Sequence, residues 1–386
     1  MKPELQTAPA APNRKHQAVA WIVYTFATIQ FVWAYHSRVT PYLHLDRYEN
    51  GLEVTPCQTR VLMMWLLRWA HHNAFLIRLA DLLSRFTPIY RSHITPETFV
   101  FAITDTAGVV LAGWVATRIY DAASERRLLS AYMYPLVLVL CTVTYVLVSL
   151  HSRSFYYDLP SLGFCAEGLY LIYFRKHRLW FAALFMIATL NRETTLVLLL
   201  FFVLAAMTES GEIDWRRGYA PRTLAVVVPL AIYWMAWHVY VNRLYLSNHT
   251  AWIPAYKINL VLLAWPPAWP QLFAAGGYTI LPIVLYRKRV KDATLRLWLW
   301  TLPAWFGLMF LYGILVESRL YGELIPYLAC MGALIAEQSI LARIGIEAQP
   351  SQPARILRKT ITPKTIVPPS PREIAARVTS RKLADG

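Results

Sequence analysis

Apolar residues in this chain come in long runs, separated by short segments that hold most of the charged residues and many of the prolines. A helix of about 20 apolar residues crosses the hydrocarbon core of a bilayer, which is about 30 Å thick. The runs predict spans at about 18–36, 97–118, 129–150, 160–174, 179–190, 195–207, 223–242, 270–286, 295–316 and 324–341. We therefore expect an all-α polytopic membrane protein with about ten transmembrane helices in a membrane domain at 18–342.

The composition supports this class, because 57% of the 386 residues are hydrophobic and only 16% are charged. The formal net charge of +16 is partly explained by residues 343–386, which hold nine of the 38 basic residues among several prolines. We expect this tail to be disordered, cytoplasmic and close to anionic lipid headgroups. No nucleic-acid-binding motif accompanies the charge, and the four scattered cysteines suggest neither a disulfide framework nor a metal site.

The basic residues are divided unequally between the two faces of the predicted membrane domain. With residues 1–17 in the cytoplasm, the inside segments before the tail hold 17 basic residues and the short outside loops hold five. Cytoplasmic loops are normally the ones enriched in Lys and Arg. We therefore expect an inner (plasma) membrane protein with both termini in the cytoplasm and its active face outside.

The same topology makes residues 179–207 a hairpin of two short helices with the sequence "NRET" at its outward tip. Each arm of about 12 residues is about 18 Å long, so the tip should lie below the outer surface in a protein-lined cavity. We expect Asn191 and Thr194 to cap the helix ends there. Arg192 and Glu193 are candidates for a salt bridge that stabilises the tip.

The longest connection in the membrane domain is the first outside loop, residues 37–96. Asp46 and Glu49 are spaced i, i+3 in "LDRYE", so a short helix would place both carboxylates on one face. The apolar stretch that follows is interrupted by charges, which predicts two amphipathic helices in the outer interface, broken near His71, His72 and Asn73. For the two histidines, an interfacial location is favoured over metal ligation.

Acidic residues are concentrated on or just below this outer face. A charged residue at the centre of a transmembrane helix costs roughly 2.5–3.5 kcal/mol, so several together suggest a functional site. Each also has a structural interpretation, such as a hydrogen bond between helices for Asp105. The acids of this group are Asp46, Glu49, Asp105, Asp158, Glu193, Glu317 and Glu323.

The order of these features resembles the GT-C superfamily of integral-membrane glycosyltransferases, in its bacterial branch. A first span is followed by a long acidic outside loop, then by the "LNRET" hairpin between short spans, and late in the chain by "ESRLYGELIP". The resemblance covers about residues 18–342. It implies inverting transfer of a sugar from a polyprenyl-phosphate carrier to an acceptor glycan, lipid or protein at the outer face.

The resemblance also suggests roles for individual residues, because a first-loop acid usually serves as base or metal ligand in that family. Asp46 is the expected base and Glu49 a second carboxylate or metal partner, with Mg²⁺ or Mn²⁺ as a possible cofactor. "DRYE" lacks the adjacent acidic pair of many of these enzymes, so metal dependence stays open. Arginine suits a departing lipid phosphate because its planar fork binds two oxygens. The candidates are Arg192, Arg319 and Arg60, supported by Asp105, Asp158, Glu193, Glu317 and Glu323, with Tyr156, Tyr157, Trp252 and Tyr321 as stacking surfaces for sugars.

Two other classes of protein fit parts of this pattern. A transporter or flippase of lipid-linked sugars predicts charges on both sides of the midplane and an internal repeat between halves, and the sequence has neither an obvious repeat nor matching Gly/Pro-broken spans. A non-catalytic membrane protein of the same fold is the second alternative. Clustering of Asp46, Asp105, Glu193 and Arg319 around one outer cavity would favour the transferase, whereas separations beyond about 15 Å would argue against a single site.

Overall fold

The computed structural model describes residues 14–37, 43–86, 94–147, 155–208, 212–248 and 255–344. All of these residues belong to one compact unit, which ends at Glu347. Every element of regular secondary structure in the described ranges is a helix. Of the predicted terminal segments, residues 1–13 and 345–386 lie outside the described ranges, and so does Trp252.

Four helices precede the first long span: α1 (Arg14–His36), α2 (Leu45–Glu49), α3 (Val61–His72) and α4 (Ala74–Phe86). Asn73 separates α3 from α4, and its Oδ1 accepts hydrogen bonds from the backbone N–H groups of Phe75 and Leu76, both at 3.1 Å. Asparagine is a favoured N-cap residue, which explains a new helix at this point. The expected break between two amphipathic helices therefore lies at Asn73.

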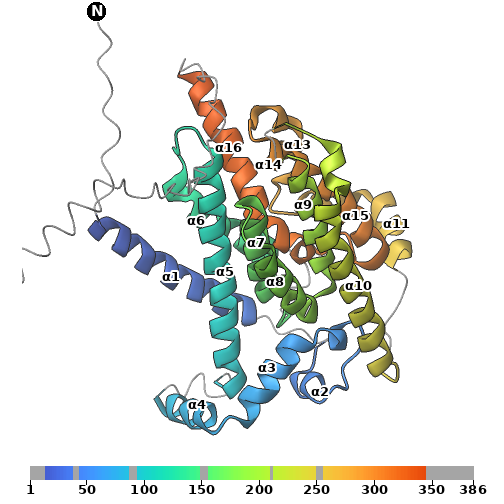
Figure 1. The fold of residues 1–386 in the computed structure, drawn as a ribbon. Coiled ribbons are helices and arrows are strands. Elements are labelled where there is room, and N and C mark those ends of the chain that lie inside the picture. The colour runs from blue at the N-terminus through green and yellow to red at the C-terminus, as the bar shows by residue number, and fades with distance from the viewer. Residues whose placement is uncertain are drawn as a thin grey trace, which may run out of the picture. The chain divides into compact units, whose positions relative to one another are not determined.

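Of the remaining helices, Met133–Cys141, Asp158–Tyr173 and Ile325–Arg343 pack directly against α5 (Pro96–Ala123), as Figure 1 shows. Short 3₁₀ segments, among them η5 (Glu193–Leu196), η9 (Trp298–Trp300) and η10 (Ser318–Leu324), join several of them. The α-helices are α5 (Pro96–Ala123), α6 (Met133–Cys141), α7 (Asp158–Tyr173), α8 (Arg178–Asn191), α9 (Val197–Ala206), α10 (Pro221–Leu244), α11 (Ala255–Ala264), α12 (Trp269–Phe273), α13 (Ile280–Tyr286), α14 (Ala293–Leu297), α15 (Thr301–Tyr312) and α16 (Ile325–Arg343).

Four helical segments of the described residues are long and apolar enough to cross a membrane. They coincide with four of the ten predicted spans, and of the other six all but the span at 270–286 stay predictions. Arg178–Asn191, Glu193–Ala206 and Ala255–Ala264 are apolar but shorter. The four long segments are Pro96–Ala123, Ser130–Leu147, Pro221–Leu244 and Ser318–Arg343.

The predicted span at 270–286 is wrong as a continuous helix. Gly276, Gly277 and Tyr278 have positive φ angles of 58°, 68° and 63°, so the chain leaves the helical conformation between α12 and α13. The structure also has a helix, α11, within residues 243–269, which connect the predicted spans at 223–242 and 270–286.

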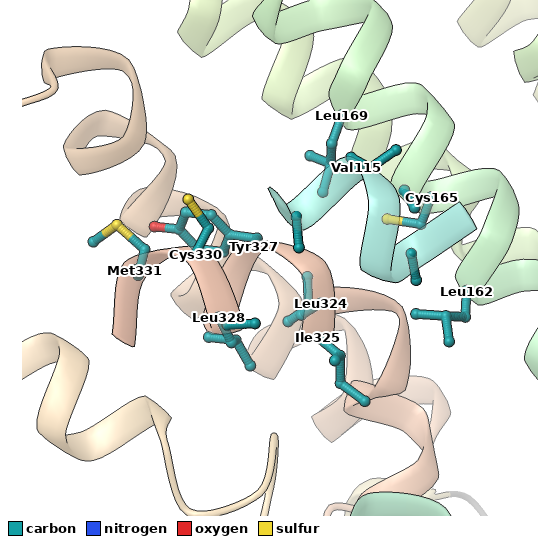
Figure 2. Packing of buried hydrophobic residues seen from close by; sticks show 14 of the residues in the cluster. Val115, Leu162, Cys165, Leu169, Leu324, Ile325, Tyr327, Leu328, Cys330 and Met331 are labelled. Atoms are coloured by element: carbon teal, nitrogen blue, oxygen red, sulfur yellow. The ribbon is translucent and has the colours of Figure 1, made fainter. Parts of the chain in front are cut away.

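The core of the bundle lies where α5, α7 and α16 meet. Figure 2 shows Val115 of α5 close to Leu169 of α7, with Leu324, Ile325 and Tyr327 on the η10–α16 side of the same cluster. All five side chains are buried. Because these helices lie far apart in sequence, their packing fixes where the ends of α5 and α7 and the η10 segment stand relative to one another.

Helices α5 and α7 approach closely at a pair of glycines. A Cβ atom at Gly108 would lie 2.3 Å from the carbonyl oxygen of Leu159, and a Cβ at Gly163 would lie 2.8 Å from the Cα of Gly108. Small residues at helix interfaces in membranes permit this approach. We expect Gly108→Ala to lower the free energy of unfolding by about 1–3 kcal/mol, because backbone atoms have to move. Unfolding in mixed micelles measures the loss.

Gly307→Ala is the matched control, because no atom lies within 4 Å of a Cβ built at that helical position. Alanine is favoured over glycine in a helix by roughly 0.5–1 kcal/mol, so this variant should be as stable as the wild type or more so. Equal stability of the Gly108→Ala and Gly307→Ala variants would contradict the close packing.

Candidate functional site

A buried network of charges joins the start of α7, the residue between α8 and η5, and η10. Arg192 Nη1 donates to Asp158 Oδ1 at 3.1 Å and lies 2.9 Å from Glu323 Oε1. Arg319 Nη1 lies 3.2 Å from Asp158 Oδ2, and its Nη2 donates to Glu317 at 2.7 Å. Arg192, Asp158 and Glu323 are at most 3% exposed. Charges removed from water to this degree are tolerated when they are paired and hydrogen-bonded, as these are.

The tip of the predicted hairpin is buried within this network. Asn191 Nδ2 donates to the carbonyl oxygen of Tyr157 at 3.0 Å and to Ser161 Oγ at 2.8 Å. Thr194 Oγ1 donates to Glu323 Oε1 at 2.7 Å. The two side chains therefore bond across to α7 and η10, and our expectation that they cap their own helix ends is wrong. Because the tip is buried, polar groups of other helices lie close to Asn191 and Thr194. The two side chains bond to these groups and not to the backbone of their own helices.

Glu193 is paired with the first loop and not with Arg192. Arg60, immediately before α3, donates from Nε and Nη2 to the two carboxylate oxygens of Glu193 at 3.2 and 2.6 Å. Its guanidinium carbon also lies 4.0 Å from the centre of the Tyr157 ring. Such two-point pairing is typical of Arg with carboxylates. The expected salt bridge between Arg192 and Glu193 is therefore wrong.

The three arginines expected to bind a donor phosphate are thus all bonded to carboxylates. A phosphate that bound one of them in this conformation would compete with a carboxylate for the same guanidinium. The pairs are Arg60 with Glu193, Arg192 with Asp158 and Glu323, and Arg319 with Asp158 and Glu317.

Asp105 lies in a second buried group, between α5 and the end of α1. Its Oδ2 is hydrogen-bonded to Nε2 of His36, and its Oδ1 has no hydrogen-bond partner. The His36 ring stacks on Phe101 with centroids 5.0 Å apart, and Phe101 stacks on Tyr156 at 4.4 Å. Tyr156 in turn lies 6.2 Å from Tyr48 of α2. A continuous row of rings therefore connects this aspartate with the first loop.

Of the aromatic residues expected to stack on sugars, two are unavailable. Tyr157 and Tyr321 are fully buried, and Tyr157 contacts Arg60. Tyr156 is partly exposed, but its ring already stacks on Phe101. The apolar environment of these rings places them in the core and not at a sugar-binding surface.

A third group of titratable side chains surrounds an open pocket beside α2. His71 Nδ1 lies 2.7 Å from Glu97 Oε1 and 3.6 Å from Glu49 Oε2. The pocket has a volume of about 360 Å³ and is lined by Asp46, His71 and Glu97, together with Leu45, Ile77, Thr95 and Pro96. Asp46 is exposed whereas Glu49 is buried, so the two carboxylates of "LDRYE" lie in different environments.

Two of these groups have shifted pKa values. Burial, together with the negative charges of Glu97 and Asp46, raises the pKa of Glu49 to about 7 against the opposing effect of His71. The hydrogen bond from His71 to Glu97 raises the pKa of the imidazole. The carboxylates around the pocket contribute to both shifts, and burial is the main cause of the shift of Glu49.

The structure therefore divides the predicted site residues among three places. Asp46 and Glu49 lie at the pocket, and Asp105 lies beside His36. The other predicted acids and the three arginines form the ion pairs described above. Glu97 and His36 were not among the predicted residues. Glu97 stands in "TPETF" and reads as an ordinary acid in the first turn of a helix, and no spacing links it to Glu49. His36 is the last residue of α1, and a histidine at the end of a predicted span is typical of the membrane interface.

The fold and these groups define an all-helical protein with helices apolar enough to cross a membrane and with a polar pocket at the start of one of them. No protein-family model matches the chain, and no significant match is found among curated proteins or solved structures.

Proposed function

We propose that this protein is a membrane glycosyltransferase that moves a sugar from a polyprenyl-phosphate donor to an acceptor at the outer face of the plasma membrane, with inversion. The pocket beside α2 carries the proposal. Its volume of about 360 Å³ lies within the range of ligand sites, roughly 300–1,000 Å³, and three titratable side chains line it. Pro96 and Glu97, at the start of the candidate span α5, are among the residues that line it.

The surroundings of the pocket suit a substrate with a lipid tail and a polar head. Trp65 and Trp69 of α3 and Phe75 and Leu82 of α4 are large apolar side chains exposed at the surface. Such residues on amphipathic helices are typical of the boundary between headgroups and acyl chains. A prenyl chain would lie along these helices while its sugar entered the pocket past Ile77 of α4, which lines it.

Asp46 is the proposed base. The acceptor hydroxyl loses its proton to this carboxylate as its oxygen bonds to the anomeric carbon, and the bond from that carbon to the donor phosphate breaks. The phosphate leaves with the electron pair and needs positive charge nearby. The candidates are Arg192, Arg319 and Arg60. None of them lines the pocket, so one of them would have to exchange its carboxylate partner for the phosphate and move toward the pocket when the donor binds.

The charged interior of the bundle supports transfer over transport in this conformation. The cavity beside Glu323, lined also by Ser161, Thr194 and Thr195, measures only about 10 Å³. This is room for about one water molecule and not for a sugar. Of these two cavities, the pocket beside α2 is the one with room for a sugar.

The test is Asp46→Asn in the purified protein, reconstituted in lipid nanodiscs with radiolabelled polyprenyl-phosphate sugars. We expect sugar release or transfer to fall by at least about 100-fold, because the base is lost while the isosteric amide keeps the shape of the pocket. Asp81→Asn is the matched control, since Asp81 is an exposed acid of α4 outside the pocket.

Two outcomes would contradict different parts of this proposal. Full activity of the Asp46→Asn protein would exclude Asp46 as the base. A folded wild-type protein that consumes no donor from a panel of polyprenyl-phosphate hexoses and pentoses would argue against the transferase itself.

A further inference from the structure

Three side chains from three helices converge beside the pocket. Glu49 ends α2, His71 lies in the last turn of α3, and Glu97 lies in the first turn of α5. One ligand atom from each lies within 4.8 Å of the other two. An imidazole nitrogen and two carboxylate oxygens are common metal ligands, so this geometry raises the question of a cation.

Glu49 supplies a second, independent observation. Its side chain is buried, with the residue only 6% exposed, and yet its Oε1 has no hydrogen-bond partner. Leaving a buried polar atom unsatisfied costs free energy, and more so for a charged group. A cation bound here would supply both the missing partner and the missing positive charge.

We propose that Glu49, His71 and Glu97 bind one divalent cation of the transition-metal type, Zn²⁺ or Mn²⁺. Metal–ligand bonds of about 2.0–2.2 Å in a tetrahedral site hold the ligand atoms about 3.3–3.6 Å apart. Of the distances from His71 Nδ1, the 2.7 Å to Glu97 lies below this range and the 3.6 Å to Glu49 lies at its upper end. Small side-chain rotations therefore suffice. The nitrogen ligand favours Zn²⁺, whereas the two carboxylates also suit Mn²⁺; Mg²⁺ and Ca²⁺ prefer oxygen alone.

The site keeps one side open. Glu49 and Glu97 are buried, but the side chain of His71 is 54% exposed and faces the pocket that Asp46 also lines. Three protein ligands and one open position are typical of catalytic metal sites, whereas structural sites are closed by four. The cation would thus present its open position to whatever occupies the pocket, and it would also tie α2 and α3 to the start of α5. Because the three ligands define the site by themselves, it does not depend on the proposed transferase activity.

The experiment measures cation binding directly. The purified protein is treated with a chelator, the chelator is removed, and Zn²⁺ and Mn²⁺ are titrated by calorimetry. Co²⁺ then serves as an absorbing probe of nitrogen and oxygen ligation. We expect one cation per chain, bound at least about 100-fold more weakly by His71→Ala, since losing even an outer-shell partner of a metal ligand costs 10- to 100-fold. Glu97→Gln should weaken binding in the same way.

His72→Ala is the matched control, because His72 is the neighbouring exposed histidine and is not one of the three ligands. It should bind like the wild type. The exposed His71 side chain can be removed without opening the core, so His71→Ala stays informative even if Glu97→Gln fails to fold. Either no stoichiometric binding of Zn²⁺ or Mn²⁺ by the wild type, or equal affinity in the His71→Ala and His72→Ala proteins, would overturn the proposal.

Discussion

The Asp158→Asn protein is expected to lose about 3–5 kcal/mol of unfolding free energy, because removing one partner of a buried ion pair leaves the other charge uncompensated. Asp158 is fully buried and holds two guanidinium groups, those of Arg192 and Arg319. Its Oδ2 also accepts a hydrogen bond from the Tyr35 hydroxyl at 3.0 Å. Asparagine keeps the volume but supplies neither the charge nor the second acceptor oxygen. Equilibrium unfolding in mixed micelles measures the loss.

An exposed ion pair provides the comparison. Asp214 lies 3.3 Å from Arg217, and about 40% of each side chain is exposed. Pairs of this kind contribute about 0–1 kcal/mol, so Asp214→Asn should be nearly neutral. A double variant, Asp158→Asn with Arg319→Gln, should recover part of the lost unfolding free energy. In this variant the buried guanidinium of Arg319 is no longer present, so only Arg192 lacks the Asp158 charge. If Asp158→Asn were as mild as Asp214→Asn, the network would not hold α7 against η10.

Trp298→Ala is expected to cost about 3–5 kcal/mol, the usual range for removing a buried tryptophan. Trp298 is fully buried, its ring lies 5.1 Å from that of Phe201 and 6.0 Å from that of Tyr327, and its Nε1 donates to the Phe201 carbonyl at 3.1 Å. Alanine would leave a cavity between α9 and α16 and would remove the hydrogen bond to the Phe201 carbonyl. The same unfolding assay measures this loss.

Trp300 lies two residues further along the same 3₁₀ segment and is 63% exposed. Trp300→Ala removes the same side chain from the surface, so it creates no cavity and should change the unfolding free energy far less. Similar losses in the two variants would mean that the segment does not pack as described. The pair therefore tests the placement of η9 independently of the charged network.

The sequence predicted a helix well where the apolar run was long. The runs at 97–118 and 223–242 are long and uninterrupted, and the structure has α5 and α10 there with ends within a few residues. The run at 270–286 read as equally continuous, yet Gly276 and Gly277 adopt positive φ angles inside it. Hydropathy does not depend on backbone conformation, so the apolar pattern gave no indication of this break.

For the candidate site, the sequence indicated charged residues that the structure divides among three groups, and it did not indicate which of them pair. Arg192 and Glu193, although adjacent, bond to different partners. The actual partners lie far apart in the sequence, with separations of 133 residues for Arg60 and Glu193 and 161 for Asp158 and Arg319. Pairings of this range depend on how helices pack, which no local spacing reveals.

Because these partners lie far apart in the sequence, the contacts of the first loop form one after another as the chain is synthesised. The first loop is made early, but Arg60 finds its carboxylate only when Glu193 has been added. Asn248, which donates to the carbonyl oxygens of Gly51 and Glu53, is made later still. Chains fold as they emerge, from the N-terminus onward. The ribosome must therefore add nearly 200 more residues after Gly51 before the loop has these partners, so a nascent chain that stops before Asn248 carries a first loop without these two hydrogen bonds.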